Sequence, residues 1–485
     1  MKEQTEKPHV IVAIVILFLL FLWELAYGLG LIDPLRFSHP LGVLPVLADF
    51  DFLRGFGLML LQVAFACLIG GSIGVLAGRL ILTSSWLTQA TLRFLRLGQW
   101  LPFFVFWALS IWGFKKGELT DAPFWIVVTV MGIIAAFPTV TLSAIYYFLS
   151  ARSTLGLKGR EARPQVVRAI ILQALLICLL WQIWLQPYGW NWFAFPVVES
   201  AAEGYAALVI LMAFIFLVDL LFGANFNSTA ELRGTILARE LAGRSWSSFL
   251  GAILLAAGCV ALWQLFSEPL KGLLLISLPV EVLGAGYRLL ISGTAIIHQG
   301  GTVWGDMGFS LIKILGGILL AGSAALVVAK CLSSSRTVGN WSFRLLPLTY
   351  AAPIVAWLFL FHWRVPVTGP FIIAWHGVAA IACLGFFPFV HVLWGLRDRP
   401  LLHRLLLALD EALPFAFLAM LFGEAYAATD GLGFFIVVAR AKYSMAEAVA
   451  GSLLALALLV GLSSTLRWVV KRLYDSESSA EVLPV

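Results

Sequence analysis

Charged residues are scarce in this chain. Only 12% of its 485 residues are Asp, Glu, Lys or Arg, whereas 61% are hydrophobic. Soluble domains carry roughly 25% charged residues, and a water-soluble chain this apolar would expose patches large enough to aggregate. The basic residues behind the net charge of +6 are scattered between apolar runs rather than clustered on one face, which argues against nucleic-acid binding. The composition predicts an integral membrane protein.

Motifs that carry catalysis are also missing. The sequence contains no Gly-x-x-x-x-Gly-Lys-Ser/Thr phosphate-binding loop, no His-Glu-x-x-His and no Gly-x-Ser-x-Gly. The seven histidines show no pairing, and the five cysteines lie in apolar runs without metal-ligand or disulfide spacing. No polar segment is long enough to hold a catalytic domain. We therefore expect neither enzymatic activity nor a metal or cofactor in this chain.

Long hydrophobic runs fill the sequence instead. A helix needs about 20 apolar residues to cross a bilayer, and windows of that kind recur about a dozen times. The first run is too long for the core of a signal peptide and predicts a retained helix. The moderately apolar stretch 269–297 is compatible with an additional interfacial helix. The predicted spans lie near 10–32, 56–82, 100–114, 123–150, 165–185, 205–226, 247–267, 303–330, 345–363, 369–394, 405–422 and 445–470.

The distribution of basic residues predicts the orientation of these spans. Cytoplasmic loops carry an excess of Lys and Arg. If the N-terminus is cytoplasmic, 22 of the 32 basic residues fall in the terminal and alternate segments assigned to that side. The opposite orientation would place the five basic residues of 151–168 outside. We expect both termini, 151–168 and 397–404 to be cytoplasmic.

Internal similarity divides the chain into two halves. A shift of 251 residues aligns 72–79 with 323–330, and the same shift matches Arg93 to Arg344, Pro102 to Pro353 and Trp112 to Trp363. Each half contains an even number of predicted spans, so the repeats have the same orientation in the membrane. The sequence therefore predicts an all-α protein of about twelve transmembrane helices, with a first half at 1–232 and a second half at 233–485.

Two segments of the second half resemble a known family. Residues 302–322 contain Trp304, Ser310-Leu311, Lys313 and Gly317 at the spacing typical of ABC importer permeases of the nitrate, sulfonate, taurine and bicarbonate group, with Lys in place of Arg. Residues 424–472 carry Glu424-Ala425, Gly431-Leu432-Gly433 and a basic end, as those permeases do. In the first half Glu199 and Asp219 resemble the family's glutamate and final-helix aspartate, but the Gly-Leu-Gly element is absent.

The resemblance implies a fold, partners and a location. It implies two type I importer permease units fused in one chain, in a bacterial inner membrane. ATP would be hydrolysed by separate cytoplasmic ATP-binding-cassette subunits, and a periplasmic or lipid-anchored binding protein would deliver a small solute. On family resemblance alone, we expect that solute to be an anion.

The family's coupling loop to the ATPase, built on Glu-Ala-Ala followed by Gly, is degenerate in both halves. The first half offers Glu161, Ala162 and Arg163, within the longer of the two loops. In the second half Pro400 shortens any helix that could form in the loop. We expect the first loop to contribute more to docking. The second-half candidates are Arg397, Arg399, Leu401, Leu402 and Arg404.

Prolines and ionisable groups at membrane depth are candidates for the pathway. Pro102 and Pro353 occupy repeat-related positions, where they either break helices that line a cavity or simply end them. Glu199 and Glu424 lie near the outer ends of predicted helices. Two roles stay open for them, gating and structural pairing. Lys313 is expected to play a structural role, with its aliphatic stem extending toward the outer interface.

Two other functions remain open at this point. An ion-coupled secondary transporter would need protonatable residues clustered near the middle of the membrane, and this chain contains few. A membrane scaffold would need neither a continuous pathway nor an ATPase.

Overall fold

The computed structural model contains only helices in the part of the chain that it describes. That part covers 21–30, 40–98, 124–150, 162–185, 201–222, 246–274, 277–292, 302–333, scattered positions between 378 and 396, 400–427, 430–442 and 444–478. No strand occurs within these ranges. The prediction of an all-α fold is therefore confirmed for the described residues.

Three continuous helical stretches are long and apolar enough to cross a membrane. The first is Phe50–Ile81, formed by α3 (Phe50–Phe65), the π-helical η1 (Ala66–Gly71) and α4 (Ser72–Ile81). The second lies in α13 (Val303–Ser333) and the third in α19 (Met445–Ser478). They contain 32, 29 and 26 suitable residues, against the roughly 20 that a bilayer requires. These helices agree with a chain that crosses the membrane more than once.

Five further helices coincide with predicted spans. They are α7 (Phe124–Leu149), α8 (Ala162–Leu185), α9 (Ala201–Phe222), α11 (Trp246–Leu274) and α17 (Leu401–Ala427). The predicted spans 100–114 and 345–363 lie outside the described residues. Those at 10–32 and 369–394 are described only in part.

Four short helices lie outside the predicted transmembrane spans. They are α2 (Pro40–Leu47), α5 (Ser85–Gly98), α12 (Pro279–Ser292) and α18 (Leu432–Ala441). Helix α5 lies between the predicted spans 56–82 and 100–114, because its polar residues lower the hydropathy on which the prediction of spans depends. Helix α12 falls in the stretch considered for an interfacial helix. Its 14 residues are too few to span a bilayer.

Small residues allow the long helices to approach one another closely. A Cβ atom added to Gly74 of α4 would lie 2.6 Å from the Cβ of Ala144 in α7, and one added to Gly78 would lie 2.7 Å from the ring of Phe148. Glycine spaced by four residues is the usual means by which membrane helices pack without a hydrophobic driving force. In α13, Gly317 fills the same role against Ile381.

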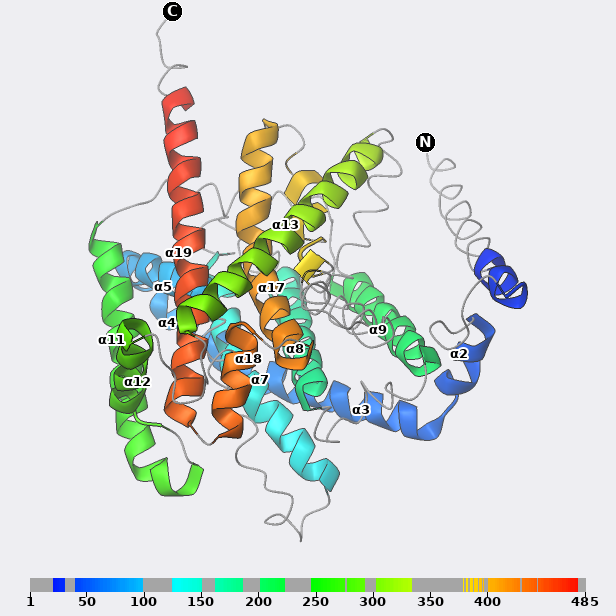
Figure 1. The fold of residues 1–485 in the computed structure, drawn as a ribbon, viewed down its shortest axis with the longest axis horizontal. Helices are drawn as coiled ribbons and strands as arrows, with labels where there is room; N and C mark the ends of the chain where they lie inside the picture. The colour runs from blue at the N-terminus through cyan, green and yellow to red at the C-terminus, as the bar shows by residue number, and fades with distance from the viewer. Residues whose placement is uncertain are drawn as a thin grey trace, which may run out of the picture.

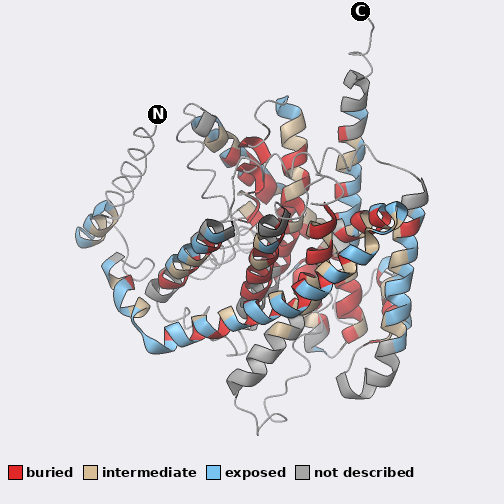
Figure 2. Cartoon of the chain, turned by 180° about the vertical axis from the view of Figure 1, so that it is seen from behind, coloured by how far each residue is buried: buried red, intermediate tan, exposed pale blue. Residues whose placement is uncertain are grey.

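Helices α17 and α19 are in contact along the middle of the molecule, and α18 lies beside the N-terminal half of α19 (Figure 1). Helix α13 contacts both α17 and α18, while α3 contacts α7 and α8. Buried residues gather on these central helices, whereas α11 and the outer side of α3 are largely exposed (Figure 2). The exposed side chains are mostly Leu, Ile, Val and Phe, as a lipid-facing surface requires.

Candidate functional site

The first turns of α13 present three polar side chains on one face. Asp306, Ser310 and Lys313 follow one another at spacings of four and three residues, and residues so spaced lie above one another on a helix. All three are buried, with 4%, 0% and 5% of their surface exposed. Lys313 was expected to reach toward the membrane interface. Instead it turns inward, because a buried carboxylate lies within its reach.

That carboxylate belongs to Glu424, in the last turn of α17. The Lys313 Nζ atom lies 3.0 Å from Glu424 Oε1, and the Ser310 Oγ atom lies 2.9 Å from both carboxylate oxygens. Glu424 has no exposed surface. Removing a charge from water costs several kcal/mol unless it is paired and hydrogen-bonded. The two buried charges therefore depend on each other.

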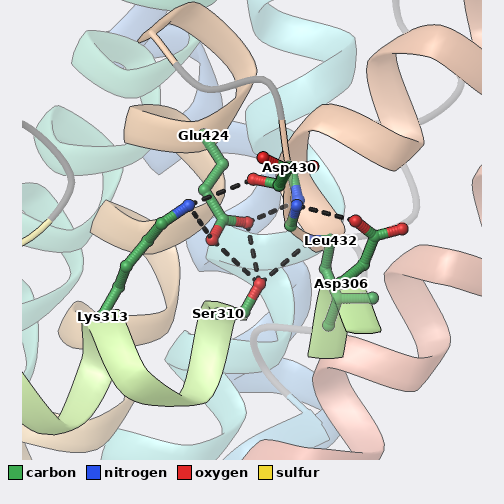
Figure 3. Close-up of polar contacts among 8 residues, drawn as sticks. Asp306, Ser310, Lys313, Glu424, Asp430 and Leu432 are labelled. Atoms are coloured by element: carbon green, nitrogen blue, oxygen red, sulfur yellow. Dashed lines mark hydrogen bonds and ion pairs between the residues drawn. The ribbon is translucent and has the colours of Figure 1, made fainter. Parts of the chain in front are cut away.

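The same side chains bind the backbone where α17 ends and α18 begins. Gly431 N donates to Asp306 Oδ1, Leu432 N donates to Ser310 Oγ and Gly433 N donates to Glu424 Oε2, each over 2.9 Å. The Lys313 ammonium also donates to the Asp430 carbonyl over 3.1 Å. Figure 3 shows these side chains pointing toward the backbone around Asp430 and Leu432. We call Asp306, Ser310, Lys313 and Glu424 the upper cluster.

The upper cluster satisfies a helix N-terminus that would otherwise be costly in a membrane. The first N–H groups of a helix have no partner within that helix. At the start of α18 the three consecutive N–H groups of 431–433 donate to side chains of α13 and α17. The two carboxylates also lie at the positive end of the α18 dipole. Together with the Lys313 ammonium, this arrangement keeps the local charge close to balanced.

Two glycines make this geometry possible. Gly431 has a φ of 113°, a backbone conformation that other residues rarely adopt. A Cβ atom there would overlap the Glu424 carboxylate, and one at Gly433 would overlap the carbonyl of Leu421. The Gly-Leu-Gly element that carried part of the family resemblance therefore allows α18 to begin directly against α17.

A second polar group joins α17 to α19. The Arg467 Nε atom lies 3.1 Å from Asp410 Oδ2, and Arg467 Nη2 donates to Ser463 Oγ over 2.9 Å. Ser463 in turn donates to Asp410. Asp410 and Ser463 are buried. We call these three residues the lower cluster. They lie toward the start of α17 and the end of α19, far along α17 from Glu424.

The structure accounts for some of the predicted site residues. Glu424 belongs to the upper cluster. Leu401 and Leu402 are exposed in the first turn of α17, and Arg404 Nη1 donates to the Leu393 carbonyl over 3.3 Å. Ala162 and Arg163 begin α8, although their side chains are not described. The remaining candidates lie outside the described residues: Pro102, Glu161, Glu199, Pro353, Arg397 and Arg399.

Three functional candidates were missed from the sequence. Asp306 could have been found, since its spacing to Ser310 and Lys313 places it on their face. Asp410 and Arg467 are 57 residues apart, and nothing in the sequence links them. Within the described residues, no three potential metal ligands lie together.

Comparison with protein-family models, with curated proteins and with solved structures finds no match to this chain.

Proposed function

We propose that the chain is the transmembrane permease subunit of an ABC importer, with permease units at 1–232 and 233–485. One observation carries the proposal. The two segments that resemble the permease family, 302–322 and 424–433, lie more than 100 residues apart in sequence and meet in the upper cluster. Ser310, Lys313, Glu424 and the Gly-Leu-Gly element thus act as one unit. A chance resemblance in an apolar sequence would not be expected to bring both segments into contact.

Recurring helix contacts support the duplication. Helix α2 packs against α9 as α12 packs against α19. Helix α3 packs against α8 as α13 packs against α17, and α8 contacts α9 as α17 contacts α19. These pairs occur in the same order along the chain. Two parallel repeats would produce this recurrence, and the pathway for a small solute, an anion by family resemblance, would then lie between them.

The energy for transport would come from partners. The chain has no phosphate-binding loop, so ATP would be hydrolysed by cytoplasmic ATP-binding-cassette subunits. Leu401 and Leu402 form an exposed apolar pair at the start of α17, and such a pair suits docking into a groove on an ATPase. Glu161, Ala162 and Arg163 would form the corresponding contact in the first half. A solute-binding protein, periplasmic or lipid-anchored, would act on the other side of the bacterial inner membrane.

Co-purification tests the proposal. A tagged chain, extracted from its native membrane in mild detergent, is expected to co-purify with an ATP-binding-cassette subunit. ATP hydrolysis is expected only in that complex. Replacing both Leu401 and Leu402 by Asp should weaken the association with the subunit, because charge prevents apolar docking. Leu473→Asp, an exposed leucine near the same end of α19, is the control and should retain it. Hydrolysis by the partner-free chain, abolished by a substitution within it, would contradict the proposal.

An ion-coupled secondary transporter is the second candidate, and the break between α17 and α18 favours it. Such transporters bind coupling ions at interrupted helices. However, the Glu424 carboxylate already accepts from Lys313, Ser310 and Gly433. Uptake that stops with a protonophore and continues without ATP would select this alternative.

Topology provides a separate prediction. Both termini, 151–168 and 397–404 are expected on the cytoplasmic side because of the excess of basic residues there. Reporter fusions at Leu157 and Leu401 should therefore both give cytoplasmic signals. Signals from opposite sides of the membrane would exclude the arrangement into parallel repeats.

A further inference from the structure

The ion pairs of the two clusters are not repeated at the aligned positions of α3 and α8. The shift of 251 residues that aligns the repeats pairs Asp306 with Gly55, Ser310 with Met59 and Lys313 with Gln62. For Asp410 in α17, a shift of 238 aligns Gln173-Ala174-Leu175 with Glu411-Ala412-Leu413, and it pairs Asp410 with Leu172. Each ion pair therefore has at least one partner, Lys313 or Asp410, that is aligned with a neutral residue. Glu199, which resembles Glu424, lies outside the described residues.

The structure places these neutral residues in the same kind of environment. Gly55, Met59, Gln62 and Leu172 are all buried, and Met59 and Leu172 belong to the main hydrophobic core. They lie on α3 and α8, which contact each other as α13 and α17 do. The same helix pair is therefore held by buried ion pairs in one half and mainly by apolar packing in the other.

These two kinds of contact respond differently to movement. In a bilayer, lipid tails are as apolar as Met or Leu, so apolar side chains that slide past each other lose little. Separating Lys313 from Glu424 would instead expose two charges to hydrocarbon. It would also release the N–H groups at the start of α18, which bind three side chains in the upper cluster.

We propose that α13, α17, α18 and α19 form a rigid body braced by the upper and lower clusters, and that α3 and α8 are the pair whose packing changes during transport. The two halves would then be mechanically unequal although they share one fold. The claim of rigidity stands by itself. The claim about transport rests on the proposed function.

Amide hydrogen exchange tests the rigidity without any partner. In the chain alone in lipid nanodiscs, amides at 306–313 are expected to be at least about tenfold more protected than the aligned amides at 55–62. The double variant Lys313→Gln/Glu424→Gln removes both charges of the upper ion pair and places at 313 the residue type that the first half has at Gln62. It should lower protection at 306–313 and 431–436 toward the level of the first half. Equal protection of the two halves in the unaltered chain would overturn the proposal.

A matched pair of cross-links tests the movement in the assembled transporter. The native Cys67 Sγ lies 3.9 Å from the Ile170 carbonyl, so Ile170→Cys offers a disulfide between η1 and α8. The aligned second-half pair is Ile318→Cys with Ala408→Cys, both buried. In both cases the other native cysteines are replaced by Ala.

The two cross-links are expected to have opposite effects. The first-half disulfide should lower ATP-driven uptake at least about tenfold, and reducing it should restore uptake. The second-half disulfide should leave uptake within about twofold of the unaltered level. Equal inhibition by both, or by neither, would overturn the assignment of movement. Failure to find an ATPase partner would instead refute the proposed function, and the exchange measurement would still decide the rigidity.

Discussion

Replacing Lys313 by Met is expected to lower the free energy of unfolding by about 3–5 kcal/mol, the usual cost of removing one partner from a buried ion pair. Glu424 would remain without exposed surface, and its nearest cation, 3.0 Å away, would be lost. The carbonyl of Asp430 would lose its ammonium donor as well. Denaturation in mixed micelles, followed by tryptophan fluorescence, measures the change.

Two further variants separate the charge from the shape of the side chain. Lys313→Arg retains the charge and should stay within about 1.5 kcal/mol of the unaltered chain, since a guanidinium can also pair with a carboxylate. Lys313→Met combined with Glu424→Gln removes both charges but leaves an amide oxygen to accept from Gly433. The double variant should therefore be more stable than Lys313→Met alone. A double variant less stable than the single one would show that the pair is not held together by charge compensation.

Much of the fold follows from the sequence because the membrane makes hydropathy informative. The spans predicted at 56–82, 303–330 and 445–470 coincide with the three long apolar helices. In each, an uninterrupted apolar run exceeds the length that a bilayer requires. The short helices α5 and α18 fall between predicted spans, since a window of about 20 residues averages over elements of 10 to 14 residues.

The site was predictable only in part, and the reason is physical. Glu424, Ser310, Lys313 and the Gly-Leu-Gly element could each be singled out from the sequence. The contact between them could not be predicted, because Lys313 and Glu424 are 111 residues apart. The inward direction of the lysine was also missed. A lysine near a helix end has two favourable positions, at the interface or against a buried carboxylate, and only tertiary packing selects between them.

Gly431 is expected to be the least replaceable glycine at the site. Its φ of 113° is strained for any residue with a Cβ atom, at a cost of about 1–3 kcal/mol. The added methyl group of Gly431→Ala would also overlap the Glu424 carboxylate. That carboxylate cannot move aside without losing Lys313, Ser310 and Gly433. We expect a total loss of about 2–5 kcal/mol in the free energy of unfolding, from strain and overpacking together.

The matched control for this substitution lies in α13. Gly308 stands between Asp306 and Ser310 in sequence, yet a Cβ atom there would meet nothing within 4 Å. Gly308→Ala should be neutral or stabilising by up to about 1 kcal/mol, because alanine favours the helix. Thermal unfolding of both variants in the same detergent compares them directly. If Gly431→Ala unfolds at the same temperature as Gly308→Ala, the start of α18 is not held against Glu424. The upper cluster would then be a loose contact that cannot brace the second half.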